Sequence, residues 1–86
     1  MYKLVFSKHA AKDAIKLASA GLKPKTMFLL TILQEDPFKT PPSFEKLKGN
    51  LSGFYSRRIN IQHRLIYEIF EDQKTVRVLR MWTHYE

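Results

Sequence analysis

The sequence predicts one α+β domain in which a strand and two helices are followed by three antiparallel strands, in the order β-α-α-β-β-β. Apolar residues recur at helical spacing between residues 8 and 36, and they alternate with polar residues at strand spacing after residue 53. A chain of 86 residues can bury one core but not two. We therefore expect a single domain over 1–86, an antiparallel sheet with an αα-hairpin on one face.

The first half of the chain contains the predicted first strand and both helices. Residues 2–6 form the strand, and Ser7 is a suitable N-cap for a helix that continues to about Ala20. The apolar stripe of this helix is predicted to consist of Ala11, Ala14, Ile15, Ala18 and Leu22. A second helix covers 24–36, because Pro24 suits a first helical turn and another proline follows Asp36.

The second half begins with a long segment, 37–53, which contains three prolines and two glycines and has no sustained period. We expect a structured loop there, and long loops in small domains are usually functional or disordered. After it the period changes to two, which predicts a three-stranded antiparallel meander with strands at 54–59, 63–70 and 75–82.

The alternation in this meander predicts which side of the sheet stays open. The better core face carries Tyr55, Ile59, Leu65, Tyr67 and Ile69, together with Arg57 and His63. If the first connection is the three residues 60–62, Arg58 lies opposite Arg64 on the open face; if it is two residues, Arg57 faces Arg64. Both registers oppose two arginines, which is destabilising unless an anion such as phosphate lies between them.

Charge and composition narrow the class of partner. Fifteen Lys and Arg against eight Asp and Glu give a net charge of +7, which attracts polyanions and makes nucleic acid the leading partner class. The chain has no cysteine, so disulfides and thiolate metal sites are excluded. It also has no long apolar run and no signal-peptide core. We expect a soluble cytoplasmic protein that does not bind membranes.

Two residues are candidates for proton transfer. Glu45 directly precedes a window from Lys46 to Tyr67 that contains five cations and no carboxylate, so it can be an ionised proton acceptor beside a basic cluster or simply a surface ion pair. His84 follows the last predicted strand, and an imidazole can donate a proton at neutral pH, although a histidine near a terminus can equally be ordinary surface.

The segment EKLKGNLSGFYSRRI (45–59), followed by HRLIY (63–67) and the closing His84-Tyr85, resembles the Txe/YoeB family of bacterial toxin-antitoxin ribonucleases, within the RelE/ParE superfamily. The resemblance covers residues 38–86 at the level of motifs and the whole chain in element order. It departs from the family pattern at Lys46, where a proline is common, at Tyr55, where a tryptophan is usual, and at Glu86, which extends the end.

The resemblance implies a RelE-like fold and a ribosome-dependent endoribonuclease that cuts messenger RNA in the A site. By position, Glu45 would remove the proton from the ribose 2′-hydroxyl, His84 would protonate the leaving 5′-oxygen, and Arg64 would stabilise the transition state. RNA-binding positions of the family match Lys48, Arg58 and Tyr85. No metal ion and no cofactor is implied.

The partners expected from this resemblance are the ribosome with its messenger and a cognate antitoxin whose acidic segment covers the basic face. Unpaired sheet edges also permit a homodimer. Two other functions stay open at this point. One is inhibition of DNA gyrase, as in the ParE branch of the superfamily. The other is a non-catalytic RNA-binding module, in which Tyr55, Trp82 and Tyr85 would be stacking surfaces.

Overall fold

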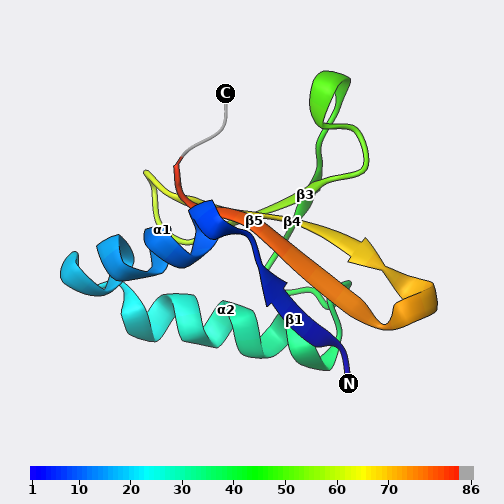
Figure 1. The fold of residues 1–86 in the computed structure, drawn as a ribbon, viewed down its shortest axis with the longest axis horizontal. Coiled ribbons are helices and arrows are strands. Elements are labelled where there is room, and N and C mark those ends of the chain that lie inside the picture. Colours follow the sequence, from blue (N-terminus) through cyan, green and yellow to red (C-terminus); the bar gives the residue numbers. More distant parts are fainter. Residues whose placement is uncertain (84–86) are drawn as a thin grey trace.

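A computed structural model describes residues 1–83 as one α+β domain with two helices and a five-stranded sheet (Figure 1). The helices are α1 (Lys8–Ser19) and α2 (Lys23–Glu35), which form the predicted αα-hairpin. Two short 3₁₀ turns, η1 (Gly49–Leu51) and η2 (Glu71–Gln73), follow later in the chain. The five strands are β1 (Lys3–Phe6), β2 (Glu45–Lys46), β3 (Tyr55–Arg58), β4 (Arg64–Phe70) and β5 (Thr75–Thr83).

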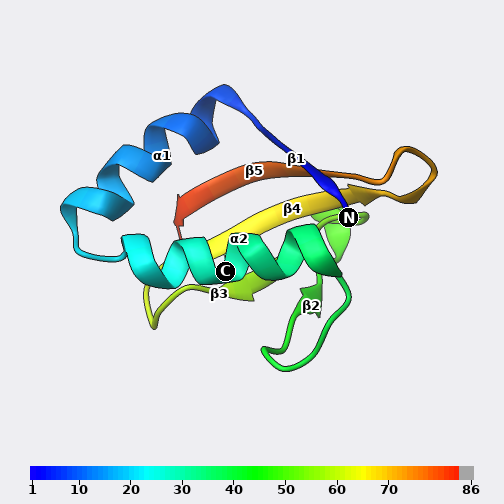
Figure 2. The same ribbon diagram turned by 90° about the horizontal axis from the view of Figure 1, so that it is seen from below.

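The sheet has the strand order β1-β5-β4-β3-β2, and both helices lie on one side of it (Figures 1 and 2). The predicted α+β class and the antiparallel meander β3-β4-β5 are confirmed. Two details differ from the prediction. Strand β2 lies inside the segment expected to be a loop, and β1 pairs with β5 in parallel rather than antiparallel orientation. About 70 residues separate β1 from β5, so no local sequence signal specifies this pairing.

Helix α1 begins where the sequence predicts but buries a different face. The Ser7 hydroxyl accepts a hydrogen bond from the Ala10 amide at 3.0 Å, as expected of an N-cap, and donates one to the Leu79 carbonyl of β5 at 2.7 Å. The buried positions are Ala10, Asp13 and Leu17. The predicted apolar stripe was wrong except at Leu22, which packs against the core, because a pattern made of apolar residues alone does not include Asp13.

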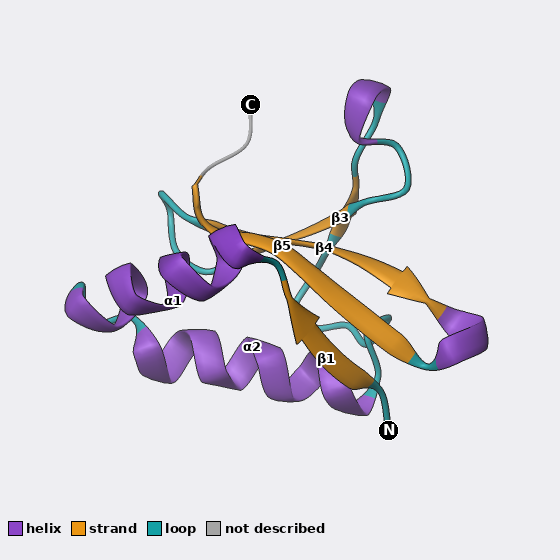
Figure 3. Cartoon of the chain, in the orientation of Figure 1, coloured by secondary structure: helices purple, strands orange, loops and turns teal. Residues whose placement is uncertain are grey.

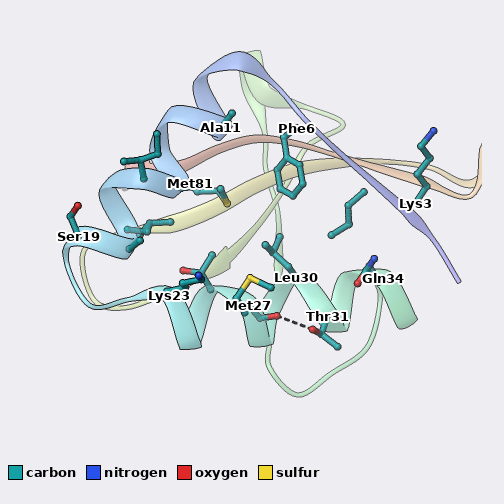
Figure 4. A pocket seen from close by; sticks show the side chains of 16 residues that line it. Lys3, Phe6, Ala11, Ser19, Lys23, Met27, Leu30, Thr31, Gln34 and Met81 are labelled. Carbon is teal, nitrogen blue, oxygen red and sulfur yellow. Dashed lines mark hydrogen bonds between the residues drawn. The ribbon is translucent and has the colours of Figure 1, made fainter.

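The four residues 11, 14, 15 and 18 of that mispredicted stripe line a groove of about 1020 Å³ between α1, α2 and β1 (Figure 4). The residue Ile15 stays 70% exposed there, and Met27 of α2 is 51% exposed. The groove contains none of the candidate site residues Glu45, Lys48, Arg58 or Arg64. It is therefore separate from the basic cluster that the sequence singles out.

The helices and the sheet form two layers (Figure 3), and the core cluster contains side chains from both: Leu17, Leu29, Leu33, Leu65, Tyr67, Val76 and Val78. The register of the β3-β4 hairpin is the three-residue alternative, with Arg58 directly opposite Arg64. The Asn60 side chain accepts hydrogen bonds from the amides of Gln62 and His63 and so stabilises the turn. Within residues 1–83, neither helix has the length and apolar character needed to cross a membrane.

Candidate active site

An ion pair joins two of the candidate catalytic residues on the open face of the sheet. The Glu45 Oε1 atom lies 2.8 Å from Arg64 Nη1. The pairing of β2 with β3 sets Glu45 opposite Ser56, and Arg64 Nη1 also donates to the Ser56 hydroxyl at 3.3 Å. The short strand β2 therefore brings a carboxylate across the hairpin to an arginine that is 19 residues away in the sequence.

Of the two side chains in this ion pair, the carboxylate is the one exposed to solvent. The Glu45 side chain is 67% exposed, whereas the Arg64 side chain is 21% exposed. An arginine held in a half-buried position keeps its guanidinium in a fixed orientation, and its planar fork matches the oxygens of a carboxylate or phosphate. The hydrogen bond uses only Oε1, so the second carboxylate oxygen can accept a proton from another molecule.

The two RNA-binding candidates in the described chain, Arg58 and Lys48, are both exposed. Arg58 is exposed and lies directly across the hairpin from Arg64, so two guanidinium groups share the open face. Opposed cations repel each other unless an anion lies between them. Lys48 is exposed in the connection between β2 and η1. These residues leave a positively charged surface beside an exposed acid.

Strand β5 ends beside the same arginine. Thr83, the last described residue, is paired in register with Arg64. The pairing of β4 with β5 shifts register twice between Arg64 and Tyr67, so β5 contains extra residues there. Such bulges turn the strand and are frequent next to active sites. His84, the predicted acid, and Tyr85 follow Thr83 in the sequence and lie outside the described residues.

A buried carboxylate on α1 holds this irregular end of β5. Asp13 Oδ2 accepts hydrogen bonds from the Met81 amide and from Arg80 Nε, both at 2.9 Å. Burial acts to raise the pKa of Asp13, but the hydrogen bonds from Arg80 and Met81 outweigh it and hold this pKa below its ordinary value. Sequence reasoning missed Asp13, because its partners are 67 and 68 residues away.

Arg57 belongs to the predicted acid-free window but does not lie on the open face. It is 1% exposed and points to the core side of the hairpin, as the strand alternation predicts. His63 is also on the packed side, 7% exposed, and its ring stacks on Trp82 with centroids 3.9 Å apart. Of the cations in this window, Lys46, Lys48 and Arg58 are exposed, and Arg64 is half-buried beside Glu45.

No metal centre is visible in the part of the chain that the structure describes. Within residues 1–83, no three His, Cys, Asp or Glu side chains come close enough together to hold an ion. What the described residues place together is an acid, an arginine that binds it and a second arginine across the strand pair. Such a set can bind a phosphate group and accept a proton beside it.

Solved bacterial toxins share this fold. A YoeB/ParE toxin from Agrobacterium tumefaciens superposes with a TM-score of 0.87 at 28% identity, covering 96% of this chain and 99% of that one. YoeB from Staphylococcus aureus, solved in a heterotetrameric complex with YefM, superposes with a TM-score of 0.81 at 30% identity, covering 99% of both chains. The S. aureus YoeB has also been solved as a dimer, with a TM-score of 0.82. The fold and site thus define a toxin of the toxin-antitoxin class.

The sequence comparison is more specific. Residues 6–85 match the family of YoeB-like toxins of bacterial type II toxin-antitoxin systems. Toxin YoeB of Streptomyces coelicolor is 36% identical over 76 residues, which are 86% of this chain and 90% of that protein. This chain belongs to the YoeB-like toxin family, as its motifs predict.

Proposed function

We propose that this toxin is an endoribonuclease that cuts messenger RNA in the ribosomal A site. The observation that supports it most is the 2.8 Å contact between Glu45 Oε1 and Arg64 Nη1 on the open face, with Arg58 across the strand pair. This arrangement offers a proton acceptor next to groups that bind a phosphodiester. The net charge of +7 favours a polyanionic substrate.

In the proposed reaction, Glu45 removes the proton from a ribose 2′-hydroxyl, and the resulting oxygen attacks the adjacent phosphorus. Arg64 stabilises the extra negative charge of the transition state. As the bond to the 5′-oxygen breaks, His84 donates a proton to it, leaving a 2′,3′-cyclic phosphate and a free 5′-hydroxyl. The scheme uses no metal ion and no cofactor. DNA lacks the 2′-hydroxyl and would be bound but not cut.

The remaining cations would hold the RNA rather than react with it. Arg58 lies across the hairpin from Arg64, Lys48 is exposed three residues after Glu45, and both can contact backbone phosphates. Tyr85 is proposed to contact the messenger in the same way, by its position in the family motif. This division of roles predicts that losing Arg58 or Lys48 weakens binding more than it slows the bound reaction.

The proposed partners are the ribosome with its messenger and a cognate antitoxin. An acidic segment of the antitoxin would cover Arg58 and Arg64 and so compete with RNA for the same charges. The S. aureus YoeB is solved with YefM and as a dimer, which supports an antitoxin complex and a homodimer for this chain. The site of action would be the cytoplasm, where messenger is translated.

The decisive experiment adds purified toxin, freed from antitoxin, to ribosomes translating a defined messenger and maps the new RNA ends. We expect cuts within the coding region that are about 10² to 10⁴ times slower for Glu45→Gln and for His84→Ala. The matched control is Glu68→Gln, which removes a carboxylate from another arginine ion pair, with Arg77, in the same sheet.

Three other results would contradict the proposed function or the proposed role of Glu45. If Glu45→Gln cuts as fast as the unaltered toxin, Glu45 is not the base. If the messenger stays intact but is retained by the protein, the chain is a binding module. If the messenger stays intact and DNA gyrase is inhibited, the chain acts as members of the ParE branch do.

A further inference from the structure

Arg57 is a buried cation without a carboxylate partner among residues 1–83. Its Nε atom donates to the Tyr67 hydroxyl at 3.0 Å. Its other nitrogens donate to three backbone oxygens of the segment before β2, at 2.9 Å to Pro37, 2.9 Å to Lys39 and 2.6 Å to Pro42. The positive charge is therefore compensated by carbonyl dipoles and a phenol rather than by an anion.

Burial of such a cation is costly unless its hydrogen bonds are satisfied. An apolar side chain would fill a core position of β3 without this cost. The acceptors explain why an arginine suits the position. Residues 37–44 contain no helix and no strand, so their carbonyl groups need other donors when they are buried. One guanidinium, with five N–H groups in a rigid fork, supplies several of them at once.

The three carbonyl groups fix the shape of this segment directly before Glu45. They span six positions, from Pro37 to Pro42, and converge on one side chain. Two residues later, the Phe44 ring lies under the same guanidinium, with Arg57 Cζ 5.1 Å from the ring centroid. The ring also packs edge-on against Tyr55 at 5.7 Å. Arg57 thus contacts the segment along its length, up to the residue next to Glu45.

Because side chains alternate along β3, the residue that binds the segment 37–42 and the residue proposed to bind RNA lie on opposite faces of the sheet. Neighbouring residues in a strand point to opposite faces, so Arg57 points to the core while Arg58 points to solvent. Ser56, which directly precedes Arg57 in β3, is the residue that pairs with Glu45 of β2. The segment 37–44, which Arg57 contacts on the core side, therefore leads into β2, whose first residue, Glu45, binds Arg64 on the open side.

We propose that Arg57 is a positioning residue for Glu45. It gathers the carbonyl groups of residues 37–42 and the ring of Phe44, and so fixes where β2 begins and where the Glu45 carboxylate lies relative to Arg64. This inference rests on the proposed function of Glu45 as the base. Arg57 itself does not touch RNA or the reacting atoms.

The test compares Arg57→Met and Arg57→Lys with the unaltered toxin in single-turnover cleavage of messenger bound on ribosomes. Displacing a catalytic group by about 1 Å can slow a reaction by about 100-fold, so we expect a loss of that order for Arg57→Met at saturating ribosome concentration. Lysine retains the charge and reaches fewer acceptors, which predicts partial recovery. The matched control is Arg77→Met, which removes a more exposed arginine with a single ion pair and should cut normally.

A second comparison separates positioning from a general loss of stability. When Glu45→Gln is already present, adding Arg57→Met should slow cleavage little further, because Arg57 acts through the carboxylate that has been removed. If the two losses multiply instead, Arg57 does not act through Glu45 and the proposal is overturned. Should Arg57→Met fail to fold, Phe44→Leu takes its place, since it removes the ring under the guanidinium and keeps an apolar side chain. We expect Phe44→Leu to slow cleavage several-fold, and to have no further effect when Glu45→Gln is already present.

Amide hydrogen exchange provides a readout that does not depend on cleavage. The Leu47 amide donates to the Phe54 carbonyl at 2.9 Å and reports the pairing of β2 with β3. In Arg57→Met we expect faster exchange at Leu47 with unchanged exchange in β4 and β5. Unchanged exchange at Leu47 overturns the role of Arg57. Absence of cleavage by the unaltered toxin overturns the proposed function instead, and the exchange result still decides whether Arg57 holds β2.

Discussion

Two irregular stretches lead to Arg64 from opposite sides of the hairpin, and buried charges of opposite sign hold them. The stretch before β2 is held by the cation Arg57, which gathers carbonyl oxygens. The end of β5 is held by the anion Asp13, which gathers the Met81 amide and the Arg80 guanidinium. A buried ion can satisfy several backbone groups of a stretch that lacks regular partners of its own.

The two stretches differ in what compensates the buried charge. Asp13 has a formal counter-charge in Arg80, whose side chain is 38% exposed, and it projects from a regular helix. Arg57 has no carboxylate partner within residues 1–83 and relies on neutral acceptors spread over six residues. The stretch before β2, which we call the loop side, should therefore lose stability when single partners of Arg57 are removed. The end of β5, the β5 side, should lose stability mainly when Asp13 itself is removed.

Among the changes that test this comparison, the largest effect is predicted at Arg64, the residue where both stretches meet. Arg64→Ala removes the partner of Glu45 and the residue in register with Thr83. We expect messenger cleavage to fall about 10²- to 10³-fold, because a preorganised donor to the transition state is lost. The free energy of unfolding should change by less than about 1 kcal/mol, since the Glu45 side chain is 67% exposed and solvent screens the ion pair.

The control for Arg64→Ala is Arg77→Ala, which breaks an ion pair of similar length, 2.9 Å, with Glu68. This variant should cut messenger at the normal rate. Equal losses of cleavage in the two variants would mean that the sheet charges act as a general field and not through Arg64.

The next effect tests the β5 side. Asp13→Ala should lower the free energy of unfolding by about 2 to 3 kcal/mol, because the buried Met81 amide loses its acceptor and Arg80 loses its partner. For a domain of this size the corresponding fall in Tm is roughly 10 to 20 °C. Thermal unfolding followed by circular dichroism measures it, with Asp72→Ala, an exposed acid, as the control.

The pH dependence of the same pair has a definite sign. Because the pKa of folded Asp13 lies below its unfolded value, its charge stabilises the fold above about pH 4, and this contribution is lost as the pH falls through the folded pKa. The difference in stability between the unaltered toxin and Asp13→Ala should therefore shrink below about pH 4. A difference that stays constant from pH 7 to pH 2 would exclude the ionised carboxylate as its cause.

The smallest predicted effect tests the loop side through Tyr67. Tyr67→Phe removes one acceptor of Arg57 and should cost about 1 kcal/mol at neutral pH. Burial raises the pKa of Tyr67 to about 12, although Arg57 acts in the opposite direction. The neutral phenol therefore stabilises the fold below pH 10, and this contribution is lost as the pH rises towards 12.

Denaturant unfolding at pH 8 and pH 11 measures the Tyr67 effect. Tyr67→Phe should lose less stability between these two values than the unaltered toxin does. Tyr2→Phe is the comparison variant, because the Tyr2 side chain is only half-buried, whereas Tyr67 is fully buried. Identical alkaline losses in the toxin and in Tyr67→Phe would contradict the buried-phenol explanation.

Much of the fold follows from local patterns in the sequence. The sequence correctly predicts the Ser7 cap and the second helix, expected at 24–36 and found at Lys23–Glu35, because both depend on residues close together in the chain. The opposition of Arg58 to Arg64 is one of the two hairpin registers that the sequence left open. The buried face of α1 was predicted wrongly for the opposite reason. Asp13 is buried only because β5 supplies its partners, and a helical pattern based on apolar residues excludes it.

The candidate site divides in the same way. The strand alternation places Arg57 on the core side and Arg64 on the open side from the sequence alone. The contact of Glu45 with Arg64 needs β2, a two-residue strand within a segment rich in proline that carries no strand signal. The proton-transfer roles of Glu45 and His84 stay predictions of the family resemblance.

The sequence by itself determined the α+β class, the toxin family and the face on which the arginines of the hairpin lie, since period, motif and parity are local properties of a chain. Only the tertiary structure decided which groups compensate the charge of Arg57, that Asp13 is buried, and that β2 carries Glu45 to Arg64. Those arrangements depend on hydrogen bonds between groups 15 to 68 residues apart. A buried charge is stable only where distant segments supply its partners, and that supply exists only once the chain has folded.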